Sequence, residues 1–168
     1  QLNMTCTAEQ LEVTIDGEGE QTLFFVHGWP DDASVWDALV AEYVAKGGYR
    51  CARVTMPHYG EHDWALFGKW RWCGYNMDAT AALLGAAVRS VRRGPDDPLP
   101  VLVVHDWGSL YAYWALARDP TIARAVVSFD IGWVNCGTLG PVDAESIRAL
   151  NFFGRKYQFA VVALWLVQ

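Results

Sequence analysis

The chain has 168 residues, of which 52% are hydrophobic, 14% aromatic and 19% charged, and its formal net charge is −6. A chain of this length is expected to form one domain around one core, and its apolar content excludes a disordered polymer. The negative charge, together with the lack of any Lys/Arg cluster longer than Arg92-Arg93, argues against a nucleic-acid partner.

The cysteines and the two ends of the chain bear on location. The four cysteines (Cys6, Cys51, Cys73 and Cys136) form no C-x-x-C pair, so neither a zinc site nor a dithiol redox site is indicated. Scattered cysteines fit a reducing compartment, and we expect a cytoplasmic protein.

The terminal apolar run, residues 159–167, is much shorter than the roughly 20 residues that span a bilayer, so membrane association is not indicated. Because this run lacks a cap and Gln1 is not an initiator Met, we expect a piece of a longer chain.

The first third of the chain predicts two strands, a helix and a third strand. Alternating residues at 11–15, a turn at 16–19 and an apolar run at 22–26 predict a β-hairpin. Ser34, followed by Asp37 in an approximate capping box, predicts the start of a helix, and Gly47-Gly48 predicts its end. Residues 49–55 predict a further strand.

The remainder continues the alternation of strands and helices. After an irregular, aromatic-rich segment at 56–76, a helix is predicted from Asp78 to Gly94-Pro95. A strand at 101–104, a helix at 110–118 and a strand at 125–129 follow. Apolar strands that alternate with helices predict an α/β fold with a doubly wound, mostly parallel sheet. The pattern changes after Gly140-Pro141, so we expect a core domain at 1–140 and a separate helical region at 141–168.

Two of the predicted strands end in residues that carry chemistry. In doubly wound sheets ligands bind beyond the carboxyl ends of the strands. One strand end is followed by His27-Gly28-Trp29-Pro30, and the other by His105-Asp106-Trp107-Gly108. The second segment has the form of a nucleophile elbow, a sharp strand-to-helix turn with the nucleophile at Asp106. Val104 stands where the general elbow has Gly, and we expect its branched side chain to crowd the turn.

A carboxylate at the elbow can act as a nucleophile. It attacks an electrophilic sp³ carbon and forms an alkyl-enzyme ester that water then hydrolyses. Alternatively, Asp106 is only the N-cap of the following helix. The loop at residues 27–30 favours catalysis, because an oxyanion hole needs the N–H after the nucleophile, here Trp107, and an N–H from an earlier loop, here Trp29. We expect His27, beside Gly28, to hold this loop by hydrogen bonds.

In this order, these two motifs resemble those of the α/β-hydrolase superfamily, in its epoxide hydrolase and haloalkane dehalogenase branch. The resemblance covers residues 10–135 and implies an α/β-hydrolase core, here incomplete, followed by the start of a helical cap. It implies that Asp106 is the nucleophile, that Trp29 and Trp107 stabilise an oxyanion or a halide, and that Asp130 is a candidate acid. Less closely, Pro57-His58-Tyr59-Gly60 and Tyr157 stand where the family has a loop over the site and a cap tyrosine.

One element of the family pattern is missing. The family uses a late His to activate the hydrolytic water, but all four histidines (His27, His58, His62 and His105) precede Asp106. We therefore expect the chain alone to be inactive in turnover.

The predicted function is an epoxide-hydrolase-like hydrolysis of a small apolar substrate without a cofactor or a metal. The alternatives are a haloalkane-dehalogenase-like hydrolase, which Val104 favours, and a non-catalytic binding protein, which the missing His favours. Ser109 is a weaker nucleophile candidate because it lies in the helix beyond the elbow. No G-x-G-x-x-G follows the first strand, which argues against nucleotide binding.

Overall fold

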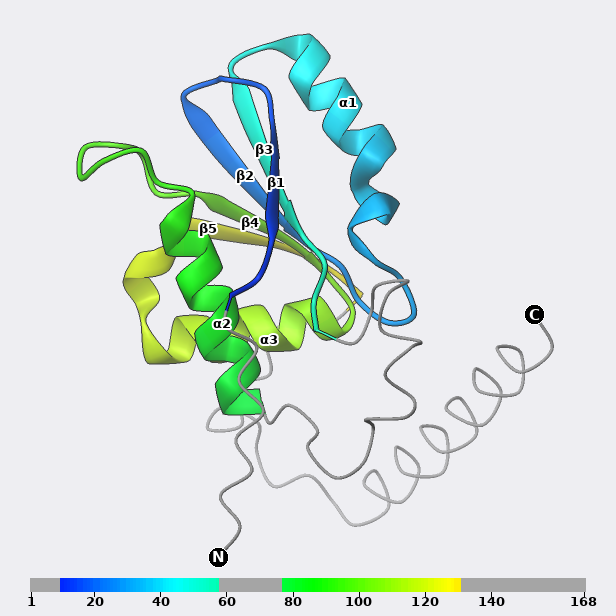
Figure 1. The fold of residues 1–168 in the computed structure, drawn as a ribbon, viewed down its shortest axis with the longest axis vertical. Coiled ribbons are helices and arrows are strands. Elements are labelled where there is room, and N and C mark those ends of the chain that lie inside the picture. The colour runs from blue at the N-terminus through cyan, green and yellow to red at the C-terminus, as the bar shows by residue number, and fades with distance from the viewer. Residues whose placement is uncertain (1–9, 58–76, 131–168) are drawn as a thin grey trace, which may run out of the picture. The chain divides into compact units, whose positions relative to one another are not determined.

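A sheet of five strands lies at the centre of residues 10–57 and 77–130, the part of the chain that the computed structural model describes (Figure 1). The strand order is β1-β3-β2-β4-β5. The strands are β1 (Val13–Asp16), β2 (Gln21–Val26), β3 (Tyr49–Val54), β4 (Val101–His105) and β5 (Ala125–Phe129). All of these residues belong to one compact unit of the chain, Gln1–Gly132.

The sheet is parallel except at one edge. β2 pairs in parallel with both β3 and β4, β4 pairs in parallel with β5, and β1 is antiparallel to β3. The carboxyl ends of β2, β4 and β5 therefore meet at the same edge of the sheet. This arrangement confirms the predicted α/β class with a doubly wound, mostly parallel sheet.

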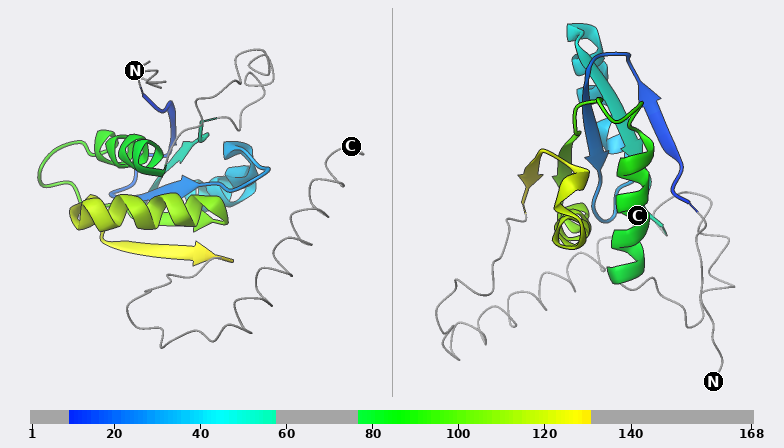
Figure 2. Two further views of the ribbon diagram at one scale, coloured as in Figure 1. Left: turned by 90° about the horizontal axis from the view of Figure 1, so that it is seen from below. Right: turned by 90° about the vertical axis from the view of Figure 1, so that its left-hand side faces the viewer.

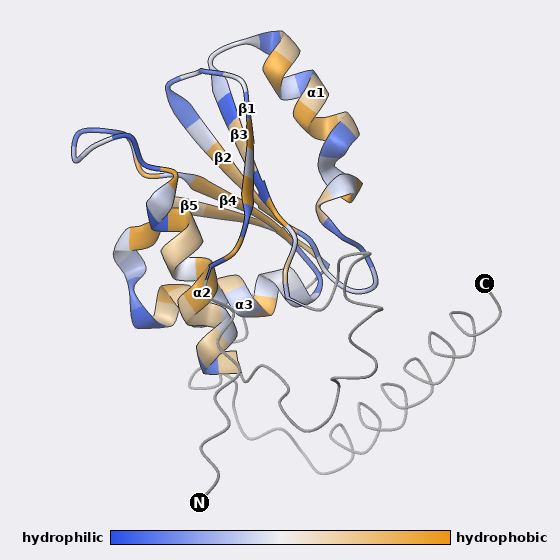
Figure 3. Ribbon diagram, in the orientation of Figure 1, coloured by the Kyte–Doolittle hydropathy of each residue, from blue (hydrophilic) through white to orange (hydrophobic). Residues whose placement is uncertain are grey.

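Helices cover both faces of the sheet (Figures 1 and 2). On one face lie the short 3-10 helix η1 (Ala33–Trp36) and α1 (Asp37–Lys46); on the other lie α2 (Met77–Ser90) and α3 (Trp107–Arg118). Another 3-10 turn, η3 (Pro120–Ile122), leads from α3 into β5. Helices on both faces explain why β2 from Leu23 to Val26 and β4 from Val101 to Val104 are continuously apolar, as the orange parts of these strands in Figure 3 show.

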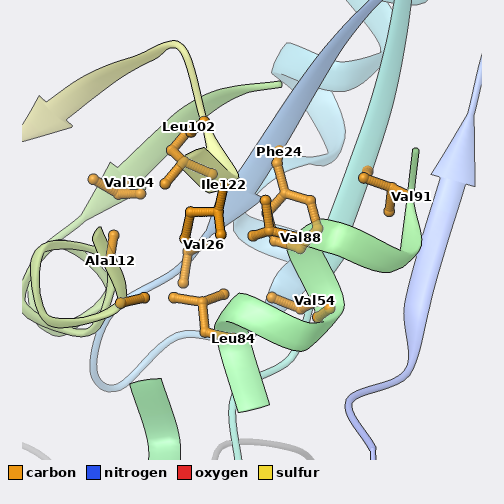
Figure 4. Packing of buried hydrophobic residues seen from close by; sticks show 14 of the residues in the cluster. Phe24, Val26, Val54, Leu84, Val88, Val91, Leu102, Val104, Ala112 and Ile122 are labelled. Atoms are coloured by element: carbon orange, nitrogen blue, oxygen red, sulfur yellow. The ribbon is translucent and has the colours of Figure 1, made fainter. Parts of the chain in front are cut away.

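The larger core lies between the sheet and the α2–α3 pair. Its side chains interdigitate from three strands and both helices, as the labelled residues of Figure 4 show. Fully buried members include Phe24 on β2, Leu84 on α2 and Leu102 on β4. A smaller cluster under α1 contains Phe25, with Trp36 packed against it at a ring-centroid distance of 5.3 Å. The two clusters pack against opposite faces of the sheet, and this close packing supports the strands whose carboxyl ends carry the loops described below.

The predicted hairpin between the first two strands is wrong. Both strands form, but β1 pairs with β3, in a register that sets Val13 opposite Val54. β2 is hydrogen-bonded to β3 on one side and to β4 on the other, so it has no free edge for β1. The intervening turn has Gly17 at a φ of 76°, a conformation that favours glycine.

The start of the first helix also differs from the prediction. The capping residue is Asp32, whose side chain accepts a hydrogen bond from the Ser34 N–H at 2.8 Å. Residues 33–36 form a 3-10 turn before α1 begins at Asp37. The predicted end is confirmed, because Gly47 terminates α1 at a φ of 71°. Asp78 lies in the first turn of α2.

Several expectations lie outside the described residues. These are the domain boundary at 140/141, most of the segment at 56–76 and the apolar run at 159–167. Of the cysteines, only Cys51 is described, and it is buried and free. Within residues 10–57 and 77–130, no helix is long and apolar enough to cross a membrane.

Candidate functional site

The chemistry-bearing residues gather where three neighbouring strands end. His27 directly follows β2, Asp106 directly follows β4, and Asp130 directly follows β5. β4 lies between the other two strands, so Asp106 stands between the loops that follow β2 and β5. This is the edge at which open α/β sheets bind their ligands.

Asp106 has an unusual backbone conformation, with φ at 48° and ψ at −125°. A residue other than glycine at positive φ is strained and persists where its surroundings hold it. Although Asp106 occupies the N-cap position of α3, its side chain makes no capping hydrogen bond. Instead, its Oδ2 accepts a hydrogen bond from the Trp29 N–H at 2.9 Å. The side chain therefore reaches across to the loop after β2, which the simple N-cap interpretation does not explain.

Two glycines allow the backbones to pass closely at this turn. A Cβ on Gly28 would lie 2.4 Å from the Cβ of Asp106, and a Cβ on Gly108 would lie 2.4 Å from the carbonyl oxygen of His27. Val104, where crowding was predicted, instead packs fully buried in the α2–α3 core. The close approach thus falls at Gly28 and Gly108 rather than at Val104.

His27 holds the loop after β2 with both ring nitrogens, as predicted. Nδ1 lies 2.8 Å from the carbonyl oxygen of Gly28, and Nε2 accepts a hydrogen bond from the Met56 N–H at 2.9 Å. Because Nε2 accepts, the proton lies on Nδ1, which donates to Gly28. Burial lowers the pKa of His27, against the opposing effects of the Gly28 hydrogen bond and the nearby Asp32 and Asp31. The ring is therefore a neutral link between the loops after β2 and β3.

Trp29 and Trp107, the two tryptophans of the motifs, are exposed, at 36% and 41%. Trp29 precedes Pro30 through a cis peptide bond and presents its own N–H to Asp106. Trp107 is the first residue of α3, and the first amides of a helix have no carbonyl partner within it. Both amides named in the sequence prediction thus border the nucleophile candidate, and the start of α3 adds a favourable field for a negative charge.

The end of β5 makes contacts with the elbow that the motifs did not predict. His105 Nε2 lies 2.7 Å from Asp130 Oδ2, and the Asp106 N–H donates to the Phe129 carbonyl at 3.3 Å. The Ser128 hydroxyl lies 2.9 Å from that of Ser109, and Ser109 is fully buried in α3. A nucleophilic role for Ser109 gains no support from this position. The sequence offers only a partial signal for these contacts: the strand before Asp130 is the next strand along the chain after the one before Asp106, which makes the two strands candidates for pairing but does not set their register.

Other sequence candidates cannot be placed. His58, His62 and Tyr157, with the segment after Pro57, lie outside the described residues. Among the residues that are described, no group of three or more His, Cys, Asp or Glu side chains is arranged to hold a metal ion.

Proteins similar to this chain in sequence and in structure are described as epoxide hydrolases. An epoxide hydrolase of Caballeronia sordidicola is 30% identical over 131 residues, which are 76% of this chain and 36% of that protein. The structures of epoxide hydrolase VrEH1 from Vigna radiata and epoxide hydrolase I (StEH1) from potato (Solanum tuberosum) share the fold, each with a TM-score of 0.60. Their identities are 21% and 20%, and each match covers 83% of this chain and 42% of the other.

The chain therefore spans less than half the length of these relatives. A sequence model described as the alpha/beta hydrolase family matches residues 23–168. These residues include most of β2, all of β3, β4 and β5, and both motifs of the site. The mostly parallel sheet and the sharp strand-to-helix turn at Asp106 agree with that match. The chain belongs to the alpha/beta hydrolase family.

Proposed function

We propose that this chain carries the nucleophile half of an epoxide-hydrolase-like site, with Asp106 as the nucleophile. The observation that carries the proposal is the strained Asp106, whose Oδ2 accepts the Trp29 N–H at 2.9 Å. A plain helix cap requires neither feature. Similarity to an epoxide hydrolase over 76% of the chain supports the same reaction class.

The first step of the proposed reaction uses the two carboxylate oxygens differently. Oδ2 is held by the Trp29 N–H, which leaves Oδ1 to attack a ring carbon of the epoxide. The new C–O ester bond forms as the ring C–O bond breaks, and the released alkoxide takes up a proton from an acid in the cap or from water. The product of this step is a hydroxyalkyl ester of Asp106.

The second step is hydrolysis of that ester. Water adds to the Asp106 carbonyl carbon, and the N–H groups of Trp29 and Trp107 stabilise the oxyanion that develops. Breaking the acyl C–O bond then releases the diol and restores the carboxylate. This step needs a base, and every histidine of the chain precedes Asp106. His27 already uses both of its ring nitrogens, so the ester is expected to accumulate on this chain alone.

The substrate class follows from what borders Asp106. Trp29 donates its backbone N–H to Asp106, Trp107 follows Asp106 in the chain, and both are exposed aromatic residues, which suits a small apolar molecule. The proposed chemistry requires only water and needs no cofactor. The buried, free thiol of Cys51 fits the cytoplasmic location expected from the scattered cysteines.

The test is covalent trapping. The chain is incubated with styrene oxide, and the intact mass is followed with time. We expect addition of one epoxide per chain, lost in Asp106→Ala and retained in Asp37→Asn, a control that alters a carboxylate exposed on α1. Addition that continues at an equal rate in Asp106→Ala would contradict the proposal.

Haloalkane dehalogenation is the second candidate, favoured by the apolar Val104 before His105-Asp106-Trp107-Gly108. A short bromoalkane separates the two: alkylation of Asp106 with release of bromide, but no reaction with styrene oxide, would favour it. If neither reagent modifies Asp106, the non-catalytic binding protein becomes the better interpretation.

A further inference from the structure

Two carboxylate residues at the site are the only non-glycine residues of 10–57 and 77–130 with a positive φ. Asp106 has a φ of 48° and Asp130 a φ of 71°. They follow directly on the neighbouring parallel strands β4 and β5. Such conformations persist where the surrounding structure holds them, and they cluster at functional sites.

The segment that ends β5 is tied to the elbow at three points. The Phe129 carbonyl accepts the Asp106 N–H at 3.3 Å, and the hydroxyls of Ser128 and Ser109 lie 2.9 Å apart. The third contact joins His105, the residue before the nucleophile, to Asp130 at 2.7 Å between Nε2 and Oδ2. Because a carboxylate oxygen only accepts, Nε2 carries the proton and donates.

We propose that His105 and Asp130 are positioning residues that brace the nucleophile elbow from the β5 side. The loop after β2 supports Asp106 on the other side, through the Trp29 N–H and the close approach of Gly28. Asp106 is then supported from both neighbouring strand ends, at its side chain by the loop after β2 and at its backbone by the end of β5. Asp130 acts through His105 on the backbone of Asp106 and is not required to act as the acid partner of another histidine.

This inference rests on the proposed function only in taking Asp106 as the nucleophile. Its test measures amide hydrogen exchange and therefore does not require catalytic turnover. Amide hydrogen exchange is measured residue by residue on the 168-residue chain. The reporters are the N–H groups of Asp106 and Ser109, which donate to the carbonyls of Phe129 and Asp106. Amides of Phe24 and Ala52, buried in β2 and β3, report on global opening.

The variants remove one partner at a time. His105→Phe keeps a ring without the donor, and Asp130→Gly removes the acceptor without a penalty at positive φ. For this partly exposed pair, whose side chains are 29% and 71% exposed, each is expected to accelerate exchange of the reporters about two- to fivefold. The double variant should be no faster than the single ones, because both remove the same contact.

Asp130→Asn is the conservative control. Asn tolerates the same backbone conformation and retains an acceptor for His105, so exchange at the reporters should stay close to that of the wild type. Asp37→Asn removes a similarly exposed carboxylate from α1 and should not change the reporters.

Four results would overturn the brace: unchanged reporters in His105→Phe, effects that add in the double variant, equal acceleration by Asp130→Asn and Asp130→Gly, or equal acceleration at Phe24 and Ala52. If Asp130→Gly does not fold, the comparison of His105→Phe with Asp130→Asn decides. If the exchange results support the brace but styrene oxide does not alkylate Asp106, the proposed function is refuted and the positioning role of His105 and Asp130 stands.

Discussion

At the scale of single residues, the site depends on how closely three backbone segments approach. Asp106 leaves the sheet at a strained φ of 48°, and the loop after β2 lies against it. Gly28 faces the Asp106 side chain, while Gly108 faces the carbonyls of Val26 and His27. A side chain at either glycine would separate the elements that place the Trp29 N–H on Asp106.

Gly108→Ala should destabilise the fold. Its Cβ would lie 2.4 Å and 2.7 Å from two backbone oxygens that cannot rotate away, and overpacking of this kind costs about 1 to 3 kcal/mol. Gly85→Ala in α2 is the matched control, because its Cβ would approach only the end of the Arg89 side chain, at 3.6 Å. In a helix that change should stabilise by up to about 1 kcal/mol. Urea unfolding measures both, and equal effects would contradict the crowding.

Stability should fall in mild acid because of His27. Burial lowers its pKa in the folded protein, so the unfolded chain binds the proton more readily. The stabilisation is complete above about pH 6.5, the ordinary value for histidine. It is lost as the pH falls from there toward the lowered pKa, with a slope of at most about 1.4 kcal/mol per pH unit. His27→Gln should flatten the unfolding free energy between pH 6.5 and pH 5; an unchanged slope in the variant would contradict the assignment.

The sequence allowed part of the site to be predicted at this scale. The order of the two motifs indicates that Asp106, Trp29 and Trp107 come together, since the carboxyl ends of parallel strands share an edge. It does not indicate the pairs His105–Asp130 and Ser109–Ser128, which join residues 25 and 19 positions apart. Those pairs depend on the register between β4 and β5, which two short apolar strands do not specify.

At the scale of elements, helical and strand periodicity predicted most of the strands and helices that lie within residues 10–57 and 77–130. The strand at 125–129 has the predicted bounds, and the predicted helix at 110–118 in fact begins at Trp107. The early start follows from the elbow, because the turn into α3 takes place at Asp106 itself. Strand pairing was less predictable than the strands themselves. β1 lies beside β3 because β3 and β4 occupy both edges of β2, and this order depends on the whole sheet rather than on the sequence of β1 and β2.

The packing of α2 predicts that two neighbouring leucines contribute unequally to stability. Leu84 is fully buried in the core of Figure 4, whereas Leu83 is only partly buried. Leu84→Ala should cost about 2 to 5 kcal/mol, and Leu83→Ala about 1 kcal/mol. Chemical denaturation of the two variants measures the difference. Equal losses would mean that α2 presents another face to the sheet.

At the scale of the whole molecule, the fold brings together residues that are distant in sequence. β2 and β4 are neighbours in the sheet, so Trp29 and Asp106, 77 positions apart, meet at its carboxyl edge. The strand–helix alternation predicted this edge, and the alpha/beta hydrolase family match over residues 23–168 agrees with it. The proposed hydrolysis also needs a base for the attacking water, and all four histidines of this chain precede Asp106.

If Asp106 is the nucleophile, the covalent bond to an epoxide must form on its side chain, and locating that bond tests the proposal. The chain is treated with styrene oxide and digested, and tandem mass spectrometry identifies the modified residue. We expect one modified side chain, Asp106, as an ester that persists because all four histidines of this chain precede Asp106. Modification spread over other carboxylates or over Cys51, with Asp106 untouched, would contradict it.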